Sequence, residues 1–115
     1  MAHLDKASIL AAPDLKREIV PVPEWGEDAT VIIGELSATD RVAFSECVGA
    51  KENEHRHYTA LGLTYFIINE DGTRTFEDSE AELLAGKNVN VLLRLFEVAK
   101  KLNGLHAAVE DVEKN

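Results

Sequence analysis

Two histidines are the residues best suited by type to carry chemistry. His55 and His57 are flanked by Glu52 and Glu54, and imidazole and carboxylate groups are common zinc ligands. Positions two residues apart point in nearly opposite directions on a helix and share a face on a strand. A zinc site would also need a further ligand from elsewhere in the chain. We interpret the stretch as a solvated polar turn or a first helical turn, and we expect no metal site.

The single cysteine, Cys47, is a second candidate because a thiolate is a nucleophile. Nothing local offers a base, and the carboxylate of Glu46 would raise the pKa of the thiol and so disfavour the thiolate. Its neighbours Phe44 and Val48 favour a helix position that faces the core. The chain also lacks the glycine-rich motifs that bind phosphates. We therefore predict no catalytic residue, no cofactor and no enzyme activity.

The composition predicts one acidic, soluble domain. The 115 residues include 21 acidic and 12 basic ones, which gives a net charge of −9. Binding to nucleic acid or to an anionic membrane surface needs the opposite sign, so neither is expected. No stretch is long and apolar enough to span a membrane, and the first residues show no secretory signal. Because one cysteine suits a reducing compartment, we expect a cytoplasmic protein.

One long amphipathic helix, from Asn88 to Leu102, is predicted to be the centre of the core. Apolar residues recur at steps of three and four, which places them on one helix face. Asn88 is suited to cap the helix start, and Gly104 is suited to the left-handed conformation that ends a helix. The predicted buried stripe consists of Leu92, Leu95, Phe96, Ala99 and Leu102.

Two apolar extended segments near the N-terminus predict a β-hairpin. They are Arg17–Trp25 and Ala29–Leu36, joined by a turn at residues 26–28. Pro21 and Pro23 cannot donate ladder hydrogen bonds, so the first segment must lie at a sheet edge. An edge presents unpaired backbone groups that can pair with a neighbouring molecule. The apolar residues beside this edge form the predicted self-association interface: Ile19, Val20, Val22 and Trp25.

The remaining segments complete the prediction of an α+β domain. Ser37 and Ser79 are suited to begin helices through capping boxes. The stretch Tyr58–Asn69 suits a helix by its spacing and a strand by its β-branched and aromatic residues, and we favour the helix. The expected fold is a small N-terminal β-hairpin followed by a bundle of three to five helices. Within this single domain we distinguish an N-terminal arm (1–16), the hairpin (17–36), a helical core (37–105) and an acidic tail (106–115).

Five segments carry a resemblance to a known family. They are ILAAPDL (Ile9–Leu15), VPVPEWG (Val20–Gly26), GELSATDRVAFSE (Gly34–Glu46), INEDGTRTF (Ile68–Phe76) and RLFEVAKKLNGL (Arg94–Leu105). In their order and spacing they resemble the tail assembly chaperones of long-tailed, siphovirus-type bacteriophages and prophages. The PEWG and FEVAKKLNGL pieces are the most specific. None of the five segments is a catalytic motif.

The resemblance implies a binding role in the host bacterial cytoplasm. By this resemblance, the chain is expected to bind the tape measure protein, keep it soluble and promote polymerisation of the tail tube. It is also expected to be absent from the mature tail. The implied partners are the tape measure protein, the tail tube protein and further copies of the chain in a head-to-tail ring or spiral.

The alternative function is an acidic inhibitor of the anti-restriction type, which mimics nucleic acid. Such a mimic needs carboxylates spaced like phosphates along one face. Here the acidic residues are interleaved with basic ones along the chain, which argues against the alternative. These basic residues include Arg41, Lys51, Arg56, Lys100 and Lys101.

Overall fold

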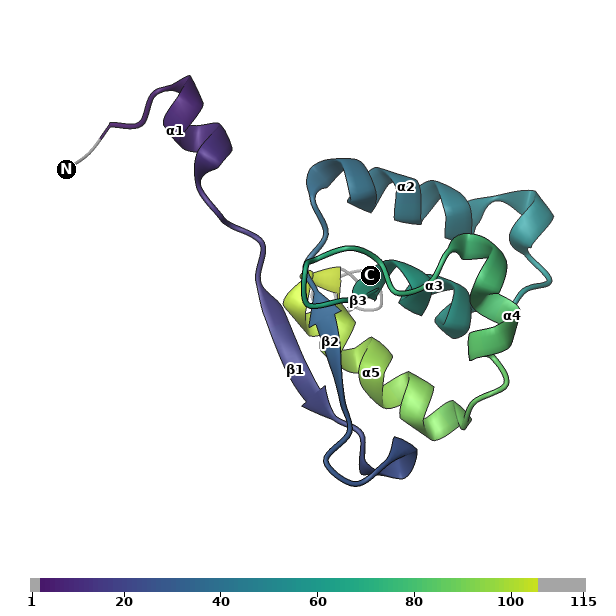
Figure 1. Cartoon of the computed structure of the whole chain (residues 1–115). Coiled ribbons are helices and arrows are strands. Elements are labelled where there is room, and N and C mark those ends of the chain that lie inside the picture. Colours follow the sequence, from purple (N-terminus) through teal and green to yellow (C-terminus); the bar gives the residue numbers. More distant parts are fainter. Residues whose placement is uncertain (1–2, 106–115) are drawn as a thin grey trace, which may run out of the picture.

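Three short strands and five α-helices make up residues 3–105, the part of the chain that the computed structural model describes (Figure 1). In chain order they are α1 (Lys6–Ala11), β1 (Arg17–Pro21), β2 (Thr30–Gly34), α2 (Ala38–Gly49), α3 (Tyr58–Phe66), β3 (Ile67–Ile68), α4 (Ala81–Leu84) and α5 (Val89–Leu102). Short 3₁₀ turns precede β2, α3 and α4. The α+β prediction is confirmed, and the predicted acidic tail, residues 106–115, lies outside the described residues.

The strands form one antiparallel sheet in the order β1-β2-β3. The predicted hairpin is present, and β1 lies at an edge, as Pro21 required. The hairpin prediction was incomplete because it did not include β3, which pairs Ile67 and Ile68 with β2. Its two residues directly follow α3, so that the chain passes from helix to sheet without a loop.

Helix α5 covers the inner face of the sheet and packs on α3. The Asn88 side chain accepts hydrogen bonds from the backbone N–H groups of Asn90 and Val91, and Gly104 adopts a φ of +74°. Both predicted ends are therefore confirmed. Four of the five predicted stripe residues are buried and Leu102 is half-buried, while Val91 is a buried member that the prediction omitted.

Helix α3 is the most buried element of the described chain. Every residue from Ala60 to Phe66 is buried. A Cβ added at Gly62 would lie 2.8 Å from Cε1 of Phe96 and 3.3 Å from Cε1 of Phe44, so this glycine lets α3 approach two aromatic rings. The helix prediction for Tyr58–Asn69 is confirmed as far as Phe66 and wrong for the two residues of β3, whose β-branched side chains suit a strand.

The caps of α2 and α4 differ in how well they were predicted. Ser37 accepts a hydrogen bond from the Asp40 backbone N–H at 3.2 Å and begins α2, as expected. The cap before α4 was wrongly assigned to Ser79. Glu77 and Glu80 form the capping box instead, with the Glu77 backbone N–H donating to Glu80 Oε1 at 2.8 Å. The 3₁₀ turn begins at Asp78, one residue before Ser79, so Ser79 lies inside the turn and does not cap it.

The N-terminal arm lies apart from the body of the domain (Figure 1). Its helix α1 is capped by Asp5, which accepts from the Ser8 backbone N–H at 2.9 Å, and it buries no residue. The arm meets the body at Lys16, whose backbone N–H donates to Glu35 Oε1 and whose carbonyl accepts from the Glu35 N–H. The arm therefore extends β1 outward rather than covering the core.

Candidate interaction surface

Of the two histidines, His57 has a local structural role. His57 is the N-cap of α3, and its Nδ1 accepts a hydrogen bond from the Ala60 backbone N–H at 3.2 Å. Within residues 3–105, no group of three or more histidine, cysteine, aspartate or glutamate side chains could hold a metal ion. The expectation of no metal site therefore stays a prediction for the whole chain.

Cys47 belongs to a partly buried polar cluster that joins α2, α3 and the turn before α4. Its thiol donates to Asp78 Oδ2 at 3.5 Å, and the Tyr65 hydroxyl donates to the same oxygen at 2.8 Å. Arg74 donates to Asp78 Oδ1 at 2.7 Å. Burial raises the pKa of both Cys47 and Tyr65. The raised pKa and the hydrogen bond to Asp78 favour a structural role for the cysteine over that of an activated nucleophile.

The four residues of the predicted interface separate into two pairs. Val20 and Val22 are 6% and 0% exposed, so they belong to the core and do not form a surface. The prediction misplaced them because alternate residues of a strand face opposite sides of the sheet. Ile19, on the other side of β1, is 62% exposed. Trp25 is half-buried against the core cluster.

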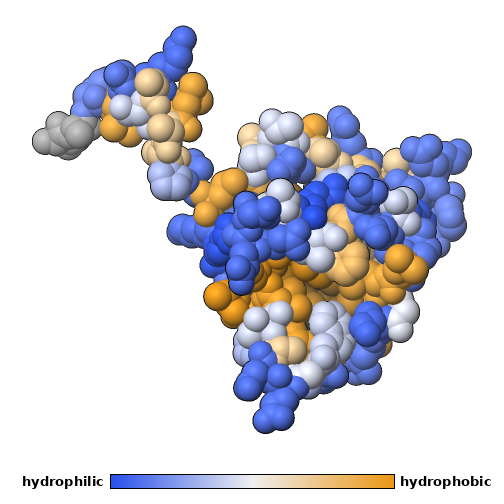
Figure 2. Space-filling model, in the orientation of Figure 1, coloured by the Kyte–Doolittle hydropathy of each residue, from blue (hydrophilic) through white to orange (hydrophobic). Residues whose placement is uncertain are grey.

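The outer face of the sheet carries a row of isoleucines, which we call the sheet groove. Ile19 pairs with Ile32 across β1 and β2, and Ile32 pairs with Ile68 across β2 and β3. Ile32 and Ile68 are half-buried. Beside them lies an open hollow of about 410 Å³ whose lining includes Thr30 and Phe76. Figure 2 shows the apolar atoms of this face as an orange band that crosses from the strands toward α4.

A second hollow, which we call the tryptophan hollow, continues this band toward α4. It measures about 420 Å³ and is lined by Trp25, Phe76, Leu83, Leu84 and Lys87. Leu83 is 71% exposed, so its apolar side chain adds to the surface of the hollow. The Lys87 ammonium lies 5.5 Å from the centroid of the Trp25 ring. The hollow thus offers an apolar floor with a cation at its rim.

An ion pair holds the turn that carries Trp25 in place. The Arg94 guanidinium donates to both carboxylate oxygens of Glu24, at 2.8 and 2.9 Å, and so links the turn Pro23–Trp25 to α5. These hydrogen bonds lower the pKa of Glu24 to about 2. The tryptophan hollow is therefore partly pre-formed, because the turn that carries Trp25 is attached to α5.

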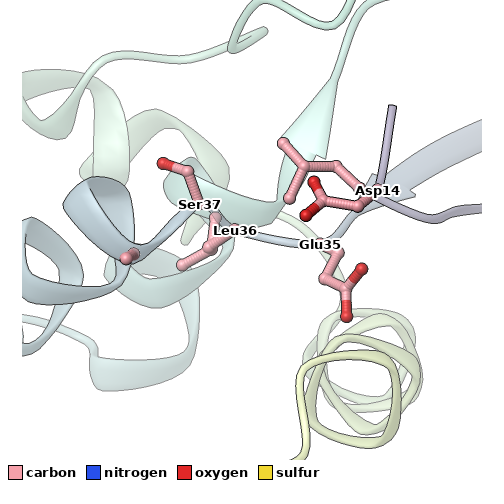
Figure 3. A pocket seen from close by; sticks show the side chains of 6 residues that line it. Asp14, Glu35, Leu36 and Ser37 are labelled. Atoms are coloured by element: carbon pink, nitrogen blue, oxygen red, sulfur yellow. The ribbon is translucent and has the colours of Figure 1, made fainter. Parts of the chain in front are cut away.

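A third hollow, of about 420 Å³, lies where the arm meets the body. Figure 3 shows the residues that line it, and the polar ends of Asp14, Glu35 and Ser37 point in different directions. Glu35 already accepts the Lys16 backbone N–H. Because its polar groups do not converge on one point, this hollow has no ligand-binding arrangement.

Basic side chains pair with several of the acidic residues on the described surface. Ion pairs join Arg56 to Glu82, Arg74 to Asp78, Arg94 to Glu24 and Lys100 to Glu97. A nucleic acid mimic needs uninterrupted carboxylates, so this pairing gives the alternative function no support. Among residues 3–105, no helix has the length and apolar character to cross a membrane.

Comparisons with known proteins were made against curated proteins, solved structures and family models. No curated protein matches the chain. Among solved structures it is similar to the tail assembly chaperone of bacteriophage HK97, with 23% identity, a TM-score of 0.57, and coverage of 84% of this chain and 90% of that chain. At that identity the likeness shows a shared fold. A family model described as phage tail assembly chaperone matches residues 6–115. The chain therefore belongs to the phage tail assembly chaperone family, as its sequence motifs predicted.

Proposed function

We propose that this chaperone binds the tape measure protein in the host bacterial cytoplasm, keeps it soluble and promotes polymerisation of the tail tube. It contacts the tail tube protein during assembly and is absent from the mature tail. This role requires binding surfaces and no catalytic group, cofactor or metal. The observation that carries the proposal is the tryptophan hollow, an open apolar surface on a chain that belongs to a chaperone family.

The chemistry of the tryptophan hollow suits a client with exposed apolar helices. A groove for an amphipathic helix needs room for a few apolar side chains and polar groups at its rim. The hollow offers about 420 Å³ over Phe76 and Leu84. Lys87 at the rim can pair with carboxylates on the polar face of a client helix. Trp25 is of the residue type most enriched at binding hot spots.

Co-expression with the tape measure protein tests the proposal. We expect the soluble fraction of the tape measure protein to rise several-fold with the wild-type chaperone and to return toward its starting level with Leu83→Ser. The matched control is Val42→Ser, because Val42 is 57% exposed on α2 and lines neither apolar hollow. A tape measure protein that stays insoluble with the wild-type chaperone contradicts the function. Equal rescue by Leu83→Ser contradicts the assignment of the hollow.

The second part of the proposal is self-association in a head-to-tail ring or spiral. A long helical client binds more tightly to a series of connected subunits than to single ones. The exposed edge of β1 and Ile19 beside it support this part of the proposal. A head-to-tail contact uses two different surfaces, so it can repeat along a filament. Light scattering on the wild-type chain should therefore give a mass above that of the monomer.

A further inference from the structure

The arm carries large apolar side chains that are more than half exposed. Ile9 is 58% exposed, Leu10 is 78% exposed and Leu15 is 55% exposed. Helix α1 has only six residues, and helices this short are unstable in water without a packing partner. In Figure 2 the apolar atoms of the arm are separated from the apolar band of the body. The arm has the features of a docking element whose acceptor is another molecule.

The charge of the arm favours a second copy of the chain as the acceptor. Residues 1–16 contain two aspartates and two lysines, which cancel, whereas the whole chain carries −9. Two acidic bodies repel each other when they approach directly. A neutral arm that reaches from one body to the next makes the contact without bringing the acidic surfaces of both bodies together.

We propose that the arm docks on the sheet groove of a neighbouring copy, with Ile9 and Leu10 packed against Ile19, Ile32 and Ile68. This inference rests on the proposed self-association and is independent of the proposed client. Ile19 and Ile32 are cross-strand partners, and so are Ile32 and Ile68, so the acceptor is a continuous apolar row. The hollow of about 410 Å³ beside this row has room for the two arm side chains.

The size of the arm fits such a contact. A stable interface uses about 20–30 residues on each side. The described part of the arm, residues 3–16, supplies about half of one side. Because the arm and the groove are different surfaces of one chain, each copy donates one arm and accepts another. The contact is therefore head-to-tail.

Mixing two defective variants tests this arrangement. The arm variant carries Ile9→Ser and Leu10→Ser, and the groove variant carries Ile19→Lys, which leaves its arm intact. Val42→Lys is the control, an exposed residue of similar type on α2. Masses come from light scattering, and circular dichroism verifies that each variant is folded. Each lost side chain should weaken self-association about tenfold or more.

We expect the wild type and Val42→Lys to assemble, and each variant alone to be monomeric. An equimolar mixture should then give a dimer that does not grow, because only one intact arm and one intact groove remain to meet. If either variant assembles like the wild type, the arm or the groove is not part of the contact and the inference is wrong. A monomeric wild type contradicts self-association itself, whether or not the tape measure protein is rescued.

Discussion

Helices α5 and α1 are both rich in apolar residues, but they differ in how much of that apolar surface they bury. Helix α5 buries five of its fourteen residues against the sheet and α3. Helix α1 buries none of its six, although Ile9 and Leu10 are as apolar as the leucines of α5. Helix α5 stabilises the monomer, and α1 adds no core contact to it. In this small domain, apolar residues thus build the core in α5 and stay exposed in α1.

The difference follows from length and from connections. Helix α5 is long enough to present a full apolar stripe, and Arg94 and Asn103 connect it to other elements. Asn103 accepts the Leu36 backbone N–H at 2.7 Å and donates to the Gly34 carbonyl at 3.3 Å. The cap of α1 is local, from Asp5 to Ser8. Because α1 is held by local hydrogen bonds, substitutions in it are expected to leave the core packing unchanged.

Removing the largest core side chain of α5 is expected to give the largest effect. Phe96 is 7% exposed and packs edge-on against Phe66, with ring centroids 6.0 Å apart. Phe96→Ala should lower the free energy of unfolding by about 3–5 kcal/mol, as measured in denaturant. That is a large part of the stability of a typical domain. An unfolding midpoint that barely moves would mean that α5 does not organise the core.

Overfilling the contact between α3 and α5 is expected to have a smaller effect. Gly62→Val places its side chain where the rings of Phe96 and Phe44 leave no space. We expect a loss of about 1–3 kcal/mol in the free energy of unfolding. Gly49→Val is the matched control, because a Cβ there meets no atom within 4 Å, and it should stay within about 0.5 kcal/mol. Equal effects at both positions would contradict close packing at Gly62.

The link between α5 and the tryptophan turn predicts a pH-dependent effect that is smaller again. The pKa of Glu24 is lowered to about 2 from 4.5, so the ion pair with Arg94 stabilises the folded state above pH 4.5. That contribution is lost as the pH falls toward 2. Arg94→Gln should therefore melt slightly below the wild type at neutral pH, and the difference should vanish under acid. A difference that does not change with pH would mean that the pair is not formed.

The arm variant Ile9→Ser with Leu10→Ser is expected to have the smallest effect on stability. Both side chains are exposed, and surface substitutions usually change the free energy of unfolding by less than about 0.5 kcal/mol. Chemical unfolding at low protein concentration, where the chain is monomeric, measures this value. A clear loss of stability would mean that the arm packs on its own body, and the contrast between α1 and α5 would then disappear.

The local signals in the sequence predicted the core well. The stripe of α5, the caps at Asn88 and Ser37, and the edge position forced by Pro21 depend on residues close to one another in the chain. The two residues of β3 were missed because they become a strand only by pairing with Ile32 and Ile33, which lie far away in the sequence. A strand of two residues is too short to show the alternating apolar pattern that predicts a strand from sequence.

The residues of the proposed interaction surface were only partly predictable. Ile19 and Trp25 were named, while Val20 and Val22 needed the strand register to be assigned to the core. Consecutive isoleucines at 32 and 33 signal a strand that is apolar on both faces, and this indicates an outer apolar surface. The tryptophan hollow joins a turn before β2 to the residues of α4, so no local pattern contains it.

Hydrogen exchange on the chaperone bound to the tape measure protein tests the central claim most directly. The account predicts slower exchange at the backbone amides of Trp25 and of Ala81–Leu84, which surround the tryptophan hollow, and unchanged exchange along α2. Protection confined to α2, or a complex that forms without protection around Trp25 and α4, would contradict the account.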